Sequence, residues 1–152
     1  MGLLVLCVTV LAGCSPLSAG FVAVEDGRYV LEIPEACGMR IFHVGVAYLE
    51  GSGSEGDFWA ADAEPGMAAN RVVLFEPNDG YVATGDGASV DVGRSVVMKW
   101  DEAADGGPGF VSGVLGDLAP GRVLWREDML SADDYGRQVL GRLADFRCVG
   151  VT

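Results

Sequence analysis

The feature that most restricts the fold of this chain is a series of short apolar runs, each ended by residues that favour turns. The runs have the length of single strands, and several alternate apolar with polar residues, as strands with one buried face do. Tyr29, Leu31 and Ile33 share one face of the first run, and Pro34 ends it because proline cannot continue a sheet ladder. The pattern therefore predicts a mostly β protein.

About eight runs carry this pattern, which favours a β-sandwich or a small barrel. Pro77, Asn78, Asp79 and Gly80 separate two of the runs and are typical of a hairpin turn, so we expect the runs on either side to pair. The runs span residues 29–33, 40–49, 58–60, 71–75, 81–84, 89–100, 110–115 and 122–125.

One segment near the C-terminus has helical spacing instead. Ser131 is a suitable N-cap, and Asp134 stands three residues later, as in a capping box. Asp133 and Arg137 are spaced for a favourable ion pair along a helix. The sequence predicts a single C-terminal helix, ending near Phe146, that covers an open edge or end of the β structure. Its apolar face would carry Tyr135, Val139, Leu140, Leu143 and Phe146.

The chain begins with an uncharged apolar run, residues 1–13, that is too short to cross a bilayer comfortably as a helix. Its length is that of the hydrophobic region of an export signal. It ends in Leu11-Ala12-Gly13-Cys14, which resembles the lipobox of bacterial lipoproteins. In that family the cysteine thiol receives a diacylglyceryl group, and a peptidase cuts the chain just before the cysteine. The alternative is a buried strand or helix over residues 3–11 of a cytosolic protein.

The resemblance implies a division of the chain into three parts. Residues 1–13 would be a signal peptide, residues 14–20 a lipidated N-terminus with a short spacer, and residues 21–152 a β-rich ectodomain. The protein would be exported and held at the extracytoplasmic face of the cell membrane by lipid on Cys14. The spacer reaches about 20 Å at most when extended, so the domain would lie close to the membrane.

The four cysteines are consistent with export. Cleavage would remove Cys7 and lipidation would use Cys14, which leaves Cys37 and Cys148. In an oxidising compartment these two are expected to form a disulfide that ties the start of the domain to its end. The alternative is a pair of unrelated buried thiols.

The charge balance limits the partners of the chain. Twenty-two Asp and Glu against ten Lys and Arg give a net charge of -12. Nucleic acid binding needs clustered Lys and Arg, so nucleic acid is not expected as a partner. Electrostatic docking on an anionic lipid surface is disfavoured for the same reason. A solvated, self-repelling surface is the ordinary explanation, and a divalent cation or a basic partner protein are the more specific ones.

Residues that could carry chemistry are few. Asp79, Asp86 and Asp91 are weak candidates for a calcium site, because their spacing does not match a known calcium loop and solvated turns explain them better. His43, the single histidine, lies in an apolar run, where a packed or edge histidine is more common than a catalytic base. Trp59, Trp100 and Trp125 could form a platform for a sugar ring, although core packing is the better interpretation.

These observations favour a membrane-anchored cell-envelope lipoprotein whose ectodomain binds or interacts without catalysis and needs no cofactor. Its partner would be the membrane, through Cys14, and an envelope protein is a further possibility. One alternative is a small exported hydrolase that uses His43. The other is a structural envelope protein without a ligand.

Overall fold

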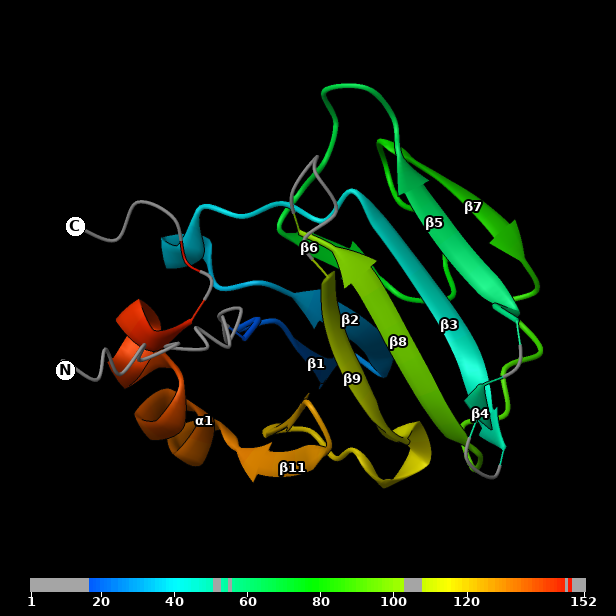
Figure 1. Ribbon diagram of the computed structural model, residues 1–152. Coiled ribbons are helices and arrows are strands. Elements are labelled where there is room, and N and C mark those ends of the chain that lie inside the picture. Colours follow the sequence, from blue (N-terminus) through cyan, green and yellow to red (C-terminus); the bar gives the residue numbers. More distant parts are fainter. Residues whose placement is uncertain (1–16, 51–52, 55, 103–107, 147, 149–152) are drawn as a thin grey trace, which may run out of the picture.

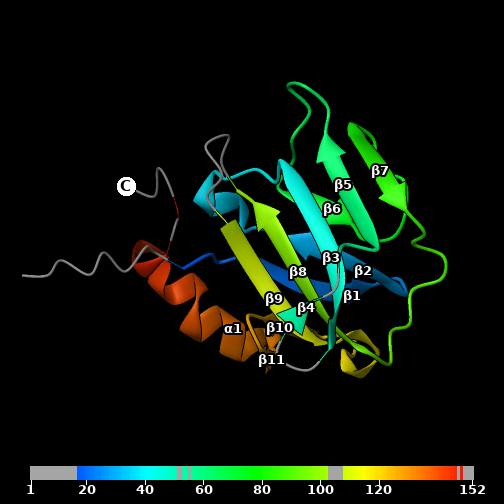
Figure 2. The ribbon, with the colours of Figure 1, turned by 45° about the vertical axis from the view of Figure 1, so that its right-hand side comes forward.

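A computed structural model of the chain describes residues 17–50, 53–54, 56–102, 108–146 and 148. Two antiparallel sheets pack face to face as a β-sandwich (Figure 1). In Figure 2, β1 and β2 of one sheet cross behind β3 and β8 of the other. The predicted sandwich is confirmed, and the described strands do not close into a barrel.

The first sheet contains five strands, and its central hairpin is explained by its turn. Asp26 and Gly27 both have positive φ angles, of 50° and 75°, which suit the tight turns that join antiparallel strands. In the order β11-β10-β1-β2-β6, the strands span Asp128–Ser131, Arg122–Trp125, Phe21–Glu25, Arg28–Glu32 and Arg71–Val73.

The second sheet is built around β3, which pairs with β8 through His43–Tyr48 and with β5 through His43–Val46. The short strand β4 (Gly53–Ser54) pairs with the end of β3. In the order β7-β5-β3-β8-β9, the other strands span Tyr81–Gly85, Trp59–Ala63, His43–Glu50, Ser95–Asp101 and Pro108–Val114. The sheets meet beside β9 and β10, where the Ser112 N–H donates to the Arg126 carbonyl at 2.7 Å.

The described residues form eleven strands rather than about eight. The sequence pattern did not identify β1, β4 or β11. Four of the five residues of β1 are apolar, so it does not alternate, while β4 and β11 are short and rich in polar or small residues. Pairing with neighbouring strands, which no local pattern records, stabilises these three as strands.

The hairpin expected around residues 77–80 is wrong, because β6 and β7 belong to different sheets. The Asn78 side chain explains the difference. Its amide oxygen accepts from the Val73 N–H at 2.8 Å, and its amide nitrogen donates to the Val73 carbonyl at 2.7 Å. One side chain thus satisfies the edge of β6 that a hairpin partner would have used, and the chain continues into the other sheet.

The core lies between the sheets and contains all three tryptophans, as expected from the sequence. Trp59, Trp100 and Trp125 are no more than 8% exposed. None of them is available as an open platform for a sugar ring. The other large, fully buried side chains include Leu31, Ile33, Ile41, Leu74, Met98, Leu115 and Leu124.

The predicted C-terminal helix begins where expected but ends early. α1 spans Ala132–Gln138, and the 3-10 helix η3 follows at Leu140–Asp145. The Ser131 side chain caps α1 by accepting from the Asp134 N–H at 3.1 Å. Arg137 pairs with Asp134 rather than with the expected Asp133.

The change of helix type alters the expected apolar face. Tyr135 and Val139 are buried, whereas Leu140 is 46% exposed. A 3-10 helix has three residues per turn, so the α-helical spacing no longer applies beyond Val139. Leu143 and Phe146 still pack against the core. No helix in the described part of the chain has the length and apolar character needed to cross a membrane.

Candidate functional site

Cys14, the expected site of lipidation, lies outside the described residues. The chain is described from Leu17, and the domain holds it from that residue onwards. Leu17 forms a parallel bridge with Phe146, and Ala19 is 1% exposed. Residues 17–20, which the sequence assigned to the spacer, are therefore packed against the folded domain.

Side chains from distant parts of the sequence fix this segment. The Trp125 indole N–H donates to the Ser18 carbonyl at 3.2 Å. The Tyr135 hydroxyl donates to the Ala19 carbonyl at 2.6 Å. Burial raises the pKa of Tyr135, so its hydroxyl keeps its proton and remains a donor throughout the physiological range. Two carbonyls that a spacer would expose to water are thus bonded inside the domain.

A buried carboxylate holds the same segment from the other side. Glu102 is 2% exposed and accepts from the Ser18 hydroxyl and from the Trp100 indole N–H, the latter at 2.9 Å. The Ser18 hydroxyl oxygen also accepts from the Gly20 N–H at 3.0 Å. We call the residues that hold residues 17–20, namely Glu102, Trp100, Trp125, Tyr135 and Phe146, the N-terminal clamp.

The sequence analysis missed the N-terminal clamp. Its contacts with residues 17–19 join positions between 84 and 129 apart, so no local spacing records them. Glu102 stands at the start of an acidic, glycine-rich stretch and resembles the solvated acids around it. Its position two residues after Trp100, which is buried, was the one available indication that it differs from them.

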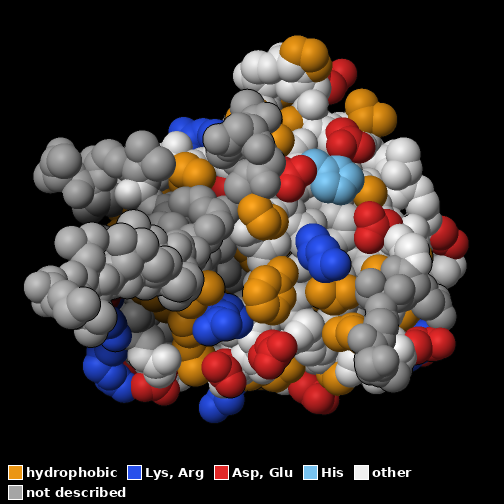
Figure 3. Space-filling view, viewed as in Figure 1, with side chains coloured by type: hydrophobic (Ala, Val, Ile, Leu, Met, Phe, Trp, Pro, Cys, Tyr) orange, Lys and Arg blue, Asp and Glu red, His pale blue; other side chains and the backbone are white. Residues whose placement is uncertain are grey.

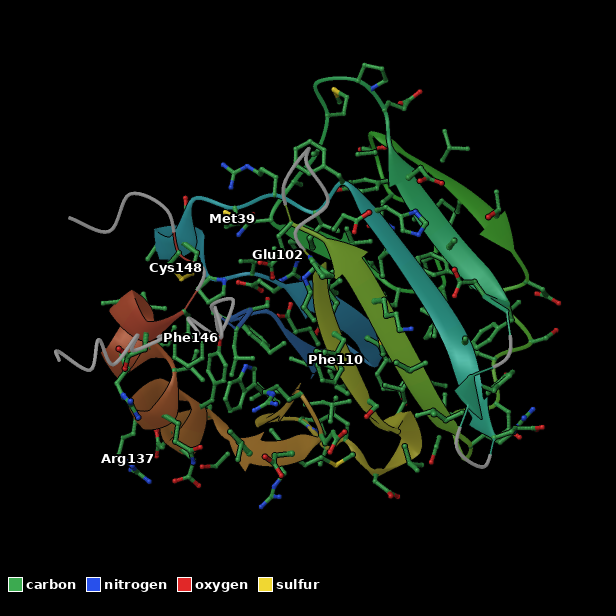
Figure 4. The ribbon with its side chains drawn as sticks, in the orientation of Figure 1. Met39, Glu102, Phe110, Arg137, Phe146 and Cys148 are labelled. Carbon is green, nitrogen blue, oxygen red and sulfur yellow. A yellow bond between two sulfur atoms is a disulfide. The ribbon has the colours of Figure 1, made fainter. Side chains whose placement is uncertain are left out.

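The expected disulfide between Cys37 and Cys148 is present, with Cα atoms 4.0 Å apart. Cys37 ends the 3-10 helix η1 (Glu35–Cys37), which follows the first sheet's β2, and is fully buried. Figure 4 places Cys148 beside η1, on the same side of the molecule as α1. The bridge therefore joins the chain beyond η3 to the chain just after β2.

His43 lies at the start of β3, on the outer face of the second sheet. Its Nδ1 lies 2.7 Å from an Asp62 carboxylate oxygen, and the two side chains are 37% and 63% exposed. Asp101 is its cross-strand neighbour on β8. Figure 3 shows the histidine among acidic side chains on this open surface. Such a pair can accept and pass a proton, but neither cross-strand neighbour is a nucleophile of the serine or cysteine class.

The acidic candidates for a cation site serve as turn residues where the structure gives them contacts. Asp86 accepts from the Ala88 N–H and the Ser89 hydroxyl, and the hydroxyl bond lowers the pKa of Asp86. Asp91 accepts from the Gly93 N–H at 3.0 Å. Asp79 is exposed. Within the described ranges, no three His, Cys, Asp or Glu side chains come together in a way that could hold a metal ion.

A small pocket lies at the turn between β10 and β11. Its volume is about 150 Å³, and Arg126, Glu127 and Asp128 line it. Small-molecule sites usually enclose about 300–1,000 Å³. The pocket contains neither His43 nor any residue of the N-terminal clamp.

Among the residues that the structure describes, two features have functional character, the N-terminal clamp and the exposed His43–Asp62 pair. No family model matches this chain, and no curated protein or solved structure matches it either.

Proposed function

We propose that this chain is an exported cell-envelope lipoprotein, anchored to the extracytoplasmic face of the membrane by lipid on Cys14. Its β-sandwich would act as a binding or interaction domain without catalysis. The proposal joins the Leu11-Ala12-Gly13-Cys14 motif to the fold that follows it. The membrane is then one partner, and an envelope protein is the class of second partner that we propose.

The disulfide between Cys37 and Cys148 is the observation that carries the proposal. Disulfides persist in oxidising compartments and are rare in the cytosol, so the bond supports export. It also accounts for the cysteines one by one. With Cys7 removed in the signal peptide and two cysteines bonded, Cys14 is the one thiol left for acylation.

Replacing Cys14 with serine tests the anchor. In a bacterial host that processes lipoproteins, we expect Cys14→Ser to move the protein from the membrane fraction to the soluble fraction. Mass spectrometry of the unaltered protein should find a mature chain that begins at an acylated Cys14. Cys7→Ser is the matched control, because that residue would leave with the signal peptide and the variant should stay in the membrane fraction.

Two results would contradict the anchor. One is a Cys14→Ser variant that remains in the membrane fraction. The other is a mature chain that begins elsewhere or that carries no acyl group. If either result is found in protein whose disulfide is intact, the lipoprotein assignment fails, whereas the disulfide still supports export.

A small exported hydrolase is the second candidate, and the bond between His43 and Asp62 favours it. A carboxylate on one ring nitrogen orients a histidine so that the other nitrogen can act as a base. If the domain is a hydrolase, His43→Ala should abolish ester or peptide hydrolysis by the purified protein while its melting temperature is retained. Binding of a partner that persists in His43→Ala, with no turnover by either form, would favour the interaction domain.

A further inference from the structure

Leu17, the first residue that the structure describes, contacts the folded domain and lies very close in sequence to Cys14, the proposed site of the lipid. Ser15 and Pro16 alone separate Cys14 from Leu17. Three fully extended residue steps reach about 11 Å at most. This step rests on the proposed function, because it takes Cys14 as the residue that carries the lipid.

Leu17 cannot swing away from the domain to lengthen this tether. It bridges Phe146, and the next two residues donate or accept hydrogen bonds within the N-terminal clamp. Phe146 is itself fixed, since its ring contacts the Trp125 ring with centroids 5.8 Å apart. Release of Leu17 would also expose the Ser18 and Ala19 carbonyls to competition from water.

The 3-10 helix η3 ends next to this point. The residues of η3 lead directly to Phe146, the bridge partner of Leu17. Leu140 and Leu17 are 46% and 42% exposed, and Arg142 and Ala144 are exposed as well. We call these exposed residues at the end of the domain where the chain enters, namely Leu17 and, on η3, Leu140, Arg142 and Ala144, the anchor face; they are grouped by their exposure and not by a common side of the helix. In Figures 1 and 2 the orange and red ribbon of α1 and η3 lies at one end of the molecule, whereas β7 lies at the other.

We infer that the anchor face lies against the lipid headgroups of the membrane that holds Cys14. The headgroup layer on each side of a bilayer is about 5–8 Å thick, which is comparable with the length of the tether. A domain fixed at Leu17 therefore cannot turn its far end towards the membrane. β7 and the outer part of the second sheet then face away from the lipid and are the surfaces that a partner can reach.

The chemistry of the anchor face suits zwitterionic headgroups and does not rely on electrostatic attraction to anionic lipid. Its exposed leucines can enter the apolar edge of the headgroup layer. Arg142 pairs with Asp145 at 2.8 Å, and Arg137, which projects from α1 in Figure 4, pairs with Asp134. Charges of both signs are thus present near the contact, so tether geometry rather than net charge sets the orientation.

Fluorescence quenching by labelled lipid tests the orientation. Leu140→Cys and Val82→Cys each place a fluorophore at an exposed apolar residue, on η3 and on β7 respectively. In the full lipidated protein the other cysteines are acylated or bonded, so the new thiol is the one that reacts. The protein is placed in phosphatidylcholine vesicles that contain a lipid with a nitroxide on its headgroup. We expect quenching to be several-fold stronger at position 140 than at position 82.

A variant with ten Gly and Ser residues inserted between Pro16 and Leu17 is the control for the tether. Its quenching at position 140 should fall towards the value at position 82. Equal quenching at the two positions in protein with a verified acyl group on Cys14 would overturn the orientation and leave the lipoprotein proposal intact. If the insertion leaves quenching at position 140 unchanged, the short tether does not set the orientation of the domain. Absence of the acyl group would overturn both.

Discussion

At the scale of single residues, the packing around Trp100 connects the core to the start of the domain. Its indole ring lies between Gly20 and Gly109, and its N–H donates to Glu102. A Cβ atom added at Gly20 or Gly109 would come within 2.5 Å of the ring. The two glycines are therefore required by a close approach of backbone to ring, and the ring in turn positions the carboxylate that holds Ser18.

Two glycine substitutions should change stability in opposite directions. In Gly109→Ala the new methyl group would overlap the Trp100 ring, so we expect the free energy of unfolding to fall by about 1–3 kcal/mol. Gly136→Ala is the matched change in α1, where a Cβ meets nothing within 4 Å. It should raise the free energy of unfolding by about 0.5–1 kcal/mol, because alanine favours helix.

Urea unfolding of the two variants beside the parent protein measures both effects. A Gly109→Ala variant as stable as the parent would show that the Trp100 ring can move without cost. Its position beside Glu102 would then be less fixed than the contacts indicate.

At the residue scale the sequence predicted core positions better than polar ones. The three tryptophans lie in the core because they stand in apolar strand runs. His43 lies on a strand as expected, but its bond to Asp62 depends on the register of β3 against β5. Glu102 was not distinguished from the acids that follow it, because its partners are remote in sequence. Local pattern records whether a side chain is apolar but not which carboxylate will be buried.

At the scale of elements, α1 shows where local rules hold. The start of the helix was predicted correctly because the cap is a contact between Ser131 and Asp134, three residues apart. The end was not predicted: a 3-10 helix follows Val139 and leads into Phe146, whose contacts with Leu17 and Trp125 are remote or tertiary and leave no local pattern. The hairpin expected at residues 77–80 is absent because a side chain, that of Asn78, takes the place of the partner strand at the edge of β6.

Removing the cap should destabilise the protein in a manner that depends on pH. Ser131→Ala removes the bond to the Asp134 N–H, which is expected to cost about 1 kcal/mol at neutral pH. It also removes the hydroxyl that lowers the pKa of Asp134 below its ordinary value of 3.8. The stabilisation linked to a lowered carboxylate pKa is present above the ordinary pKa and is lost as the pH falls through the folded-state pKa.

The difference in stability between parent and Ser131→Ala should therefore be largest at neutral pH and become smaller in acid. Thermal unfolding of both proteins from neutral pH to about pH 3 measures this. Ser89→Ala is a comparison outside α1, since Ser89 bonds Asp86 in an exposed turn. A difference that stays constant with pH would mean that the Asp134 carboxylate gains nothing from the cap.

At the scale of the whole molecule, the layers were predictable and their connections were not. Runs of strand length with turns between them predict two layers, because each apolar face must be buried against another. Which strand pairs with which depends on contacts between distant residues, as in β1, which lies between β2 and β10. The disulfide was predicted because the prediction needed only the number of cysteines and the expectation that the domain lies in an oxidising compartment. The packing of residues 17–20 was not, because a short stretch of small residues has the composition of a linker.

The disulfide between Cys37 and Cys148 should act on the end of the molecule that holds residues 17–20 before it acts on the sandwich. It closes a loop of 111 residues, for which a chain-entropy account gives a stabilisation of about 4–5 kcal/mol. Locally, Cys148 is two residues beyond Phe146, and its N–H donates to the Phe146 carbonyl at 2.8 Å. Phe146 in turn bridges Leu17. The disulfide therefore restrains the residue that holds the N-terminal segment in place.

Replacing both cysteines with alanine should therefore lower the free energy of unfolding by about 2–5 kcal/mol. Hydrogen exchange should locate the effect, with protection lost first at residues 17–20 and in η3, while β3 and β8 stay protected until global unfolding. Reduction of the parent protein should reproduce the pattern, which separates loss of the bond from the effect of the substitutions. Equal loss of protection in β8 and in η3 would show that the disulfide stabilises the whole sandwich, and that η3 and residues 17–20 do not open separately from it.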